Sequence, residues 1–547
     1  MIEGPSAWET RPEDHRLESP HSGHPALRTS SRKALPALLA LALATAPVQA
    51  PLAQVRLPAL GEAAAEDFSV GTERRIGEQI MREIRRDPAY LDDPVLQEYL
   101  QSIWQPLLAA ARARGDIEPD VNQLFAWEAF LVRDRSVNAF ALPGGFIGVH
   151  LGLISLTVST DELASVMAHE LSHVTQRHIA RGLVNSQRMS MVGLAALLLG
   201  VLAASRGGGT DMANAAIMGG QGVAAQGQLN FSRDMEREAD RLGYGILGAA
   251  GFSTLGMATM FEKLDSANRI NDSGSFPYLR SHPLTVERMS EARSRAIFGS
   301  AGNPSPPLRH ALMQMRARVL ADTDPNTLRR LQQQAAGVPG APLRERLAAA
   351  YAGALAAMLL RDNATAERLA ASGLALAAES GAQREPQAER VLQLLQAQLR
   401  LERGEPAAAL QALDALSADP RGRAAMLLRG QALLELQRKD GSAGTALREL
   451  TETLQTWVAD HPLDATAWAL LSNTAEAIGL KLRSLRAAAE AQAASGDLNG
   501  AIDRLRAAQQ AARGAAGRDF IEASVIDARL RDLQNQRRQL ILEAKGN

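Results

Sequence analysis

The stretch from residue 162 to residue 178 constrains the fold most, because it holds the pattern H-E-x-x-H at His169, Glu170 and His173. On a helix, residues i and i+4 share a face, so the two imidazoles can point at one metal ion. Neutral imidazole suits zinc, and the glutamate beside the first histidine can serve as a general base. Apolar residues recur around the pattern with helical spacing, and Asp161 is the predicted N-cap. The pattern therefore predicts a buried helix that supplies part of a zinc site.

A catalytic zinc site needs a third protein ligand and keeps one position for water. One extension of the pattern would place a third histidine at residue 179, but the chain has Ile179 there. His178 lies off the face that His169 and His173 share, so we interpret it as a structural residue. The third ligand must therefore come from another part of the chain.

The best source of that ligand is the acidic run Glu236, Glu238 and Asp240, in a helix predicted over residues 234–247. Glu236 and Asp240 are four residues apart and share a face, whereas Glu238 points elsewhere. One carboxylate can bind zinc while the other accepts the Nδ1–H of a ligand histidine. We assign Glu236 to the metal and Asp240 to that hydrogen bond.

Composition excludes several other functions. The net charge of −1 gives no electrostatic case for binding nucleic acid. The absence of cysteine excludes disulfides, thiolate zinc sites, a thiol nucleophile and a lipoprotein anchor. The chain's 547 residues are enough for roughly two to four domains, and the abundance of alanine and leucine favours helix.

The N-terminal region has the features of an export signal. Residues 1–33 are polar and aperiodic, and we interpret them as a disordered leader or an overcalled start. Residues 34–53 carry no charge and follow several basic residues, as in a signal-peptide hydrophobic region and cleavage zone. We expect export. An uncleaved membrane anchor is the alternative, because prolines follow both candidate cleavage sites.

The next segments predict helices and then a small sheet. Helices are expected over residues 67–86 and after the turn at residues 92–94. Residues 124–132, 138–142 and 146–150 are predicted strands, which places a sheet directly before the zinc helix. An unpaired edge of this sheet can bind a peptide main chain, and a purely structural sheet fits the pattern equally well.

An uncharged apolar segment follows the zinc helix, from Met189 to Ser205. It is short for a membrane span, which needs about 20 apolar residues. A buried helix, an active-site lid and a membrane-dipping loop all fit the segment. Peripheral membrane contact therefore remains among the predictions.

The C-terminal half is expected to be helical throughout. Residues 301–307 form a linker by composition, and residues 308–547 show paired helices with turns between them, including one repeat of about 34 residues. Such arrays form concave surfaces for partners, and a helical bundle that only shields the protease is the alternative. We predict that His310 and His461 lie at the surface. The predicted fold class is α+β: a mainly helical metalloprotease domain with a small sheet over residues 54–300, then an all-α, TPR-like (tetratricopeptide-like) domain.

Several segments resemble, in the same order, those of one metallopeptidase family. These are residues 130–134, 136–141, 143–145, 162–170 and 236–240. The family is that of the CAAX-prenyl-protease-like gluzincins, which includes bacterial heat-shock and outer-membrane quality-control proteases. The chain is most similar to its soluble periplasmic branch of assembly-enhancing proteases, which carry a C-terminal tetratricopeptide array. The resemblance is strong over residues 70–300 and extends by architecture over residues 308–547.

This resemblance implies one zinc ion per chain, held by His169, His173 and Glu236, with Glu170 as the catalytic base. It also draws attention to His282, in a segment that resembles the family's His-Pro segment. In the periplasmic branch this histidine can approach the zinc as a fourth ligand, and in related enzymes a second histidine stabilises the oxyanion.

Two further features follow from the resemblance. The sheet edge near Asn138 and Ala139 is similar to the family's substrate strand, and Arg288 is placed to orient a carbonyl or an acid. The assembly-enhancing branch carries cysteines, and this chain has none, so a redox-dependent clamp between domains is impossible here.

The resulting hypothesis is a periplasmic zinc endopeptidase that degrades unfolded or misassembled outer-membrane proteins and aids their assembly. Its repeat array would contact these clients or the barrel-assembly machinery, and nucleic acid is not an expected partner. The alternative is a TPR chaperone or scaffold of outer-membrane assembly with latent or minor proteolysis. A membrane-embedded prenyl-type protease is a weaker reading, because the sequence lacks several long apolar spans.

Overall fold

The computed structural model describes residues 69–185, 232–270, 276–299, 307–335, 340–379, 381, 384–416, 419, 422–514 and 520–545. Contacts divide the chain after Ala59, and all of these residues lie in the second unit, residues 60–547. The predicted export signal, the apolar segment from Met189 to Ser205 and residues 301–306 of the predicted linker lie outside the described residues.

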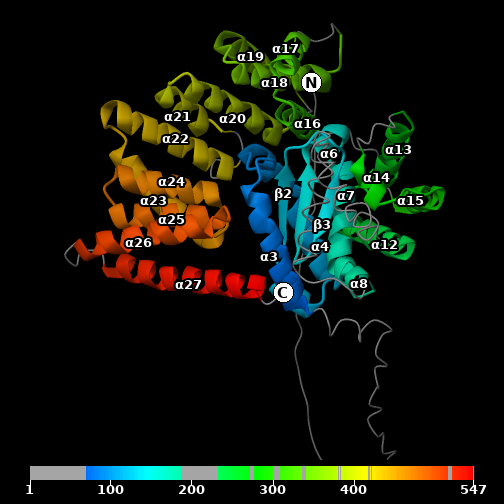
Figure 1. The fold of residues 1–547 in the computed structure, drawn as a ribbon. Helices are drawn as coiled ribbons and strands as arrows, with labels where there is room; N and C mark the ends of the chain where they lie inside the picture. The colour runs from blue at the N-terminus through cyan, green and yellow to red at the C-terminus, as the bar shows by residue number, and fades with distance from the viewer. Residues whose placement is uncertain are drawn as a thin grey trace, which may run out of the picture. The chain divides into compact units, whose positions relative to one another are not determined.

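The first half of the described chain combines helices with four short strands (Figure 1). Its elements are α3 (Val70–Arg86), β1 (Tyr90–Leu91), α4 (Pro94–Arg114), α5 (Pro119–Leu124), β2 (Glu128–Val132), β3 (Ala139–Leu142), β4 (Phe146–His150), α6 (Leu151–Leu156), α7 (Thr160–Thr175), α8 (His178–Asn185), α12 (Arg233–Ala249), α13 (Leu255–Ile270), α14 (Pro277–Ser281) and α15 (Val286–Gly299). The strand predicted over residues 124–132 begins later in the structure, at Glu128, because residues 119–124 form a short helix that begins with proline. The other two predicted strands are found within one residue of their expected bounds.

The four strands form one mixed sheet in the order β1-β2-β4-β3. β2 and β4 are parallel, whereas β1 pairs antiparallel with β2 and β3 pairs antiparallel with β4. Because β3 is last in this order, it lies at an edge of the sheet. Alternate side chains enter two cores: Phe130 and Val132 pack with α3, while Ala129 and Leu131 join the cluster that includes α4 and α7. Both faces are therefore covered, which explains why the strands read as continuous apolar runs.

The second half is helical throughout (Figure 1). Its helices are α16 (Leu308–Ala321), α17 (Pro325–Gln334), α18 (Leu343–Leu359), α19 (Asn363–Ala378), α20 (Pro386–Glu402), α21 (Pro406–Asp414), α22 (Arg423–Asp440), α23 (Gly444–Asp460), α24 (Ala465–Ala477), α25 (Lys481–Ala494), α26 (Leu498–Gly514) and α27 (Phe520–Lys545). Successive helices pack against each other, as helical repeats do. The sequence predicted an α+β domain followed by all-α repeats, and the structure confirms this class. None of the helices among the described residues combines the length and apolarity that crossing a membrane requires.

The prediction that His310 lies at the surface is wrong. Its side chain is fully buried, and His310 Nδ1 lies 2.5 Å from the Tyr99 hydroxyl while Nε2 lies 3.0 Å from the Thr157 carbonyl oxygen. These partners come from α4 and from the residue that ends α6, so no local pattern around residue 310 could reveal them. His461 is exposed, as expected.

Three arginines of the repeat helices hold the acidic start of α4. Arg316 of α16 makes two hydrogen bonds to Asp93, at 2.6 and 2.7 Å, and Arg390 of α20 approaches Glu98 to 2.6 Å. The third pair is Arg423 of α22 with Asp92, at 2.7 Å. We call these six residues the arginine clasp. It fixes the repeat helices to the helix that packs beside α7, because paired guanidinium and carboxylate groups have strict geometry.

Candidate metal centre

Helix α7 places the H-E-x-x-H residues in the interior of the first half. It begins at Thr160, and its N-cap is Ser159, whose hydroxyl accepts the Glu162 N–H at 3.2 Å. The predicted cap, Asp161, instead lies in the first turn and accepts the Ser253 N–H at 2.9 Å. From Glu162 to Thr175 every residue of α7 is buried. The histidines of this helix are therefore shielded from water.

Helix α12 approaches α7 closely and carries the acidic residues to the histidines. A Cβ atom added at Gly243 would lie 3.1 Å from the backbone nitrogen of His169, so a larger residue there would push the helices apart. This close approach brings Glu236 Oε2 to 3.5 Å from His169 Nε2, and Glu236 Oε1 to 3.4 Å from His173 Nε2. Glu236 is thus directed at the face that the two histidines share.

Four buried side chains converge on one point: His169, His173, Glu236 and His282. One ligand atom from each lies within 4.8 Å of those from the other three. The Nε2 atoms of His169 and His173 are 3.0 Å apart, and His282 Nδ1 lies 3.3 Å from His169 Nε2 and 2.9 Å from Glu236 Oε1. His282 follows α14 as its C-cap, so three separate segments build the group.

This group suits a divalent cation. Imidazole nitrogens and a carboxylate oxygen, without sulfur, are a donor set that zinc accepts. Facing ring nitrogens at 3.0 Å repel each other through their lone pairs unless a proton or a cation lies between them. The residues predicted for the metal therefore fit it, and the group could hold a metal ion.

Asp240 and Arg288 lie behind His169. Asp240 Oδ1 is 2.9 Å from His169 Nδ1, and Arg288 binds the same carboxylate through Nε at 2.6 Å and Nη2 at 2.9 Å. Arg288 Nη1 also lies 2.8 Å from Glu236 Oε2. The aspartate fixes the ring of His169 with Nε2 directed at the metal position, and the arginine holds both carboxylates.

The pKa shifts show a site that gathers negative charge. Burial opposes ionisation of Asp240, but hydrogen bonds from Arg288 and His169 lower its pKa to about 2. Burial likewise opposes ionisation of Glu236, yet its contacts with the surrounding histidines hold the pKa of this carboxyl well below its ordinary value. Burial lowers the pKa of His173, which keeps that imidazole neutral. Ionised carboxylates beside a neutral imidazole favour a bound cation.

Glu170 faces the group but does not belong to it. Its carboxylate is fully buried, and Oε1 lies 3.5 Å from His282 Nε2. Burial raises the pKa of Glu170, while nearby His282, His169 and the Ala141 amide lower it. A carboxylate with a raised pKa beside a metal position can accept and return a proton near neutral pH.

Two contacts near the metal group were not predicted from the sequence. The buried ring of Tyr278 stacks on His282 at 4.6 Å between centroids, so it holds that histidine in place. Its signal would have been an aromatic residue four positions before the histidine, within a helical turn. Glu238 is not directed at the metal group, as predicted, but its Oε2 lies 3.0 Å from His178 Nε2.

The edge strand β3 runs beside α7. Its predicted substrate contact Asn138 is buried, and the Asn138 carbonyl accepts the His150 N–H at 3.1 Å within the sheet. In an antiparallel ladder the direction of these groups alternates, so the peptide groups of Ala139 and Ala141 point away from β4, to the open edge. Phe140, which lies between them, packs on Phe130 and His150. The edge next to the metal group therefore carries the outward peptide groups of Ala139 and Ala141, and both residues are buried.

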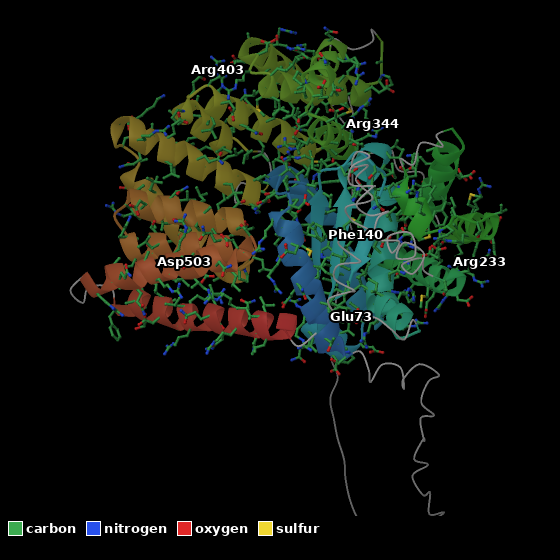
Figure 2. The ribbon with its side chains drawn as sticks, viewed as in Figure 1. Glu73, Phe140, Arg233, Arg344, Arg403 and Asp503 are labelled. Atoms are coloured by element: carbon green, nitrogen blue, oxygen red, sulfur yellow. The ribbon has the colours of Figure 1, made fainter. Side chains whose placement is uncertain are left out.

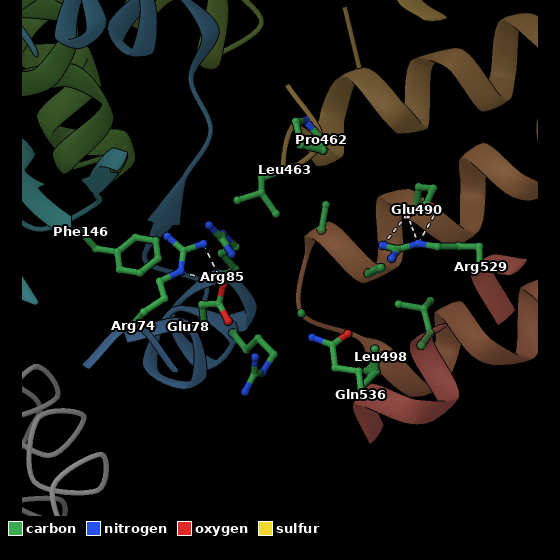
Figure 3. Close-up of a pocket in the computed structure, with 15 residues that line it drawn as sticks. Arg74, Glu78, Arg85, Phe146, Pro462, Leu463, Glu490, Leu498, Arg529 and Gln536 are labelled. Atoms are coloured by element: carbon green, nitrogen blue, oxygen red, sulfur yellow. Dashed lines mark hydrogen bonds and ion pairs between the residues drawn. The ribbon is translucent and has the colours of Figure 1, made fainter. Parts of the chain in front are cut away.

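A separate cavity of about 160 Å³ lies between α3 and the helices α25 to α27 (Figure 3). None of the predicted site residues lines it. Its arginines already face carboxylates: Arg74 bonds Glu78 at 2.8 Å, and Arg529 bonds Glu490 at 2.9 Å. This cavity has no part in the chemistry of the histidine group.

Comparison with known proteins adds an independent finding. The model of peptidase family M48 matches residues 94–296, which include all four members of the metal group. The putative beta-barrel assembly-enhancing protease of Vibrio cholerae is 37% identical over 290 residues, which cover 52% of this chain and 56% of that protein. The beta-barrel assembly-enhancing protease of Escherichia coli strain K12 is 35% identical over 243 residues, 44% of this chain and 47% of that protein.

These two matches span about half the length of the relatives concerned. A longer match exists with the beta-barrel assembly-enhancing protease of Yersinia pestis, 29% identical over 488 residues. It covers 88% of this chain and 92% of that protein. The similarity therefore extends beyond the metal group into the repeat helices.

Proposed function

Because residues 94–296 belong to peptidase family M48, we propose that the protein is a zinc-dependent endopeptidase of the cell envelope. The observation that supports this most is the buried group of His169, His173, Glu236 and His282, whose ligand atoms lie within 4.8 Å of one another. Buried ionisable groups at such separations need a cation or a proton between them. The family match and the donor set point to the same chemistry.

In this proposal His169, His173 and Glu236 are the protein ligands of one zinc ion. When bound, zinc would polarise the scissile carbonyl and lower the pKa of water. Asp240 accepts the Nδ1–H of His169, which leaves Nε2 of that ring free to bind the metal. Arg288 balances the charge of the two carboxylates of α12.

Glu170 is the proposed general base. Its raised pKa lets it take a proton from the attacking water and return it to the leaving amine. The Ala141 amide and His282 lie near its carboxylate and orient it. The other two carboxylates of the described site, Glu236 and Asp240, are each held by Arg288 and by histidine.

His282 is the proposed control element. Its Nδ1 lies at hydrogen-bond distance from Glu236, 2.9 Å, and its Nε2 faces Glu170. In this position the ring occupies the space that water needs, as a fourth ligand in a resting state would. Movement of His282 away from Glu236 would then open the site for substrate.

We place the substrate along β3 as an added strand. The outward peptide group of Ala139 and the carbonyl of Ala141 can bind an extended chain, which would pass beside Glu170. Asn138 supports this edge from within the sheet, since its carbonyl is bonded to His150. An extended, unfolded segment fits such an edge better than a folded protein does.

The proposed clients are unfolded or misassembled outer-membrane proteins, and the proposed compartment is the periplasm. Support comes from relatives that are named beta-barrel assembly-enhancing proteases, one of which matches 88% of this chain. The helical repeats, read as a TPR-like array, would contact these clients or the barrel-assembly machinery.

Metal analysis combined with casein cleavage tests the proposal. We expect about one zinc per purified chain and cleavage that a chelator stops. Glu170→Gln should abolish cleavage, by roughly 10²- to 10⁴-fold, while zinc is retained. Glu287→Gln, at an exposed position, is the matched control and should leave zinc content and cleavage unchanged. A folded protein without zinc would refute the proposal, and zinc without Glu170-dependent cleavage would favour the scaffold function.

A further inference from the structure

The two histidines of α7 differ in how their outer nitrogens are held. His169 Nδ1 lies 2.9 Å from Asp240, a direct contact with a carboxylate. His173 Nδ1 lies instead 2.9 Å from Nδ1 of a third histidine, His178. Metal-ligating histidines need a partner at the outer nitrogen, because that partner fixes the ring and its tautomer.

His178 is in turn connected to an acid. Its Nε2 lies 3.0 Å from Glu238 Oε2, and Arg181 Nη1 is 3.0 Å from the same oxygen. His178 is fully buried, whereas the Glu238 side chain is 31% exposed. The chain of contacts therefore starts at His173 in the interior and ends at a carboxylate near the surface.

The hydrogen positions along this chain follow from simple valence. If His173 binds a metal through Nε2, its proton is on Nδ1 and is donated to His178 Nδ1. His178 must then carry its own proton on Nε2, which it donates to Glu238. Each neutral imidazole thus has one donor and one acceptor in use, with no atom left in conflict.

The backbone is shaped to put His178 in this place. Arg177, just before it, has a φ of 52°, a left-handed conformation that few residues other than glycine adopt. This residue separates α7 from α8, and its Nε donates to the buried carboxylate of Glu73 at 2.8 Å. The left-handed backbone of Arg177 costs free energy, and the ion pair with Glu73 helps to hold it. Such strain indicates that the position of the next residue, His178, matters for function.

We propose that His178 and Glu238 are positioning residues for the metal centre, forming a relay that orients His173 as Asp240 orients His169. This inference rests on the proposed function, because it assumes that His173 binds a metal. It assigns all three acids of the run in α12: Glu236 to the metal, Asp240 to one ligand histidine, and Glu238 to the other through His178. The interpretation of His178 as merely structural is thereby replaced.

Zinc affinity, measured by competition with a chelating dye, tests the relay. His178→Phe keeps a ring but removes both hydrogen bonds, and we expect zinc affinity to fall by about 10- to 100-fold. His178→Asn places an amide oxygen near the Nδ1 position, where it can accept from His173, so it should recover much of the loss. Glu238→Ala should give a smaller loss, and the exposed Asp234→Ala on the same helix should give none.

Thermal unfolding without zinc separates positioning from packing. A packing role predicts that His178→Phe and His178→Asn lower the melting temperature of the metal-free protein and leave zinc affinity unchanged, which would overturn the relay. Equal zinc affinity in wild type and His178→Phe would also overturn it. Failure of the wild type itself to bind zinc would overturn the proposed function and the relay together, so the two failures can be told apart.

Discussion

The metal group and the arginine clasp both contain buried charged groups, Glu236 in the first and the pair of Asp93 and Arg316 in the second, but they are built on opposite principles. In the clasp, every carboxylate faces a guanidinium: Asp93 accepts two bonds from Arg316 and a third from the Leu96 N–H at 2.9 Å. In the metal group, Glu236 faces one guanidinium, that of Arg288, and three imidazoles that can be donors or acceptors. The Arg316–Asp93 pair of the clasp is complete with protein atoms alone. The metal group is balanced only with a proton or a cation added.

This difference shows how burial alone fails to identify function. Arg316, Asp93 and Glu236 are all nearly inaccessible to solvent. What separates the two clusters is the kind of partner, since arginine satisfies a carboxylate fully and histidine leaves a nitrogen for a metal. The same substitution should therefore have different consequences in the two places.

The largest effect is expected for Glu236→Ala in the metal group. Zinc should be lost on dialysis, and casein cleavage should fall on the order of 10³-fold or more, because water without a metal keeps its high pKa. The metal-free protein should stay folded, since the clasp is unaffected. Zinc content, cleavage rate and circular dichroism check this. Retention of a full equivalent of zinc would show that Glu236 is not a ligand.

The counterpart in the clasp is Asp93→Ala. Removing one partner of a buried ion pair should lower the free energy of unfolding by about 3–5 kcal/mol, because Arg316 keeps its charge without a counterion. Zinc affinity should be unchanged. Urea unfolding measures the loss. Asp503→Ala, at an exposed ion pair (Figure 2), is the control and should cost less than about 1 kcal/mol. A similar small loss for Asp93→Ala would mean that the clasp does not hold the halves together.

A third prediction compares buried histidines with and without acidic partners. His169 has a pKa raised to about 10 by Asp240 and Glu236 in spite of burial, whereas burial lowers the pKa of His310 from 6.5 to about 4. In the unfolded chain the histidine side chain takes up a proton near pH 6.5, whereas in the folded protein His310 takes up a proton only near pH 4. Stability should therefore fall as pH drops through this window, with about 3 kcal/mol from His310.

His310→Phe should reduce that acid-dependent loss, and this is measured as the slope of unfolding free energy against pH between 6.5 and 4. The slope is compared rather than the absolute stability, because Tyr99 and Thr157 lose a hydrogen-bond partner in the variant. The exposed His461→Phe serves as the control. An unchanged slope in His310→Phe would contradict the assignment.

The smallest effect is expected for His282→Ala, which removes the proposed resting-state ligand and leaves His169, His173 and Glu236 in place. If the ring blocks the site at rest, kcat/KM for casein should rise. The rise should be roughly tenfold if moving the ring out of the site costs about 1.4 kcal/mol. His461→Ala is the matched surface control. A loss of activity would assign His282 to the oxyanion instead.

Local patterns predicted much of the fold. The strand over residues 146–150 and the helix around Glu236 were readable because their periodicity is short and strong. The start of α7 was predicted two residues late, since Ser159 and Asp161 are both good caps and only the fold decides between them. The burial of His310 was missed because its partners are more than 150 residues away along the chain.

By itself, the sequence determined that His169 and His173 share a face and that Glu236 and Asp240 share another. Those relations depend only on the rise and turn of one helix. Tertiary structure alone decided that His282 closes the group, that Arg288 binds both carboxylates and that His178 connects His173 to Glu238. The contacts of His282, Arg288 and Glu238 join segments 46 to 113 residues apart, and the close packing that creates them depends on residues such as Gly243 that carry no chemical signal.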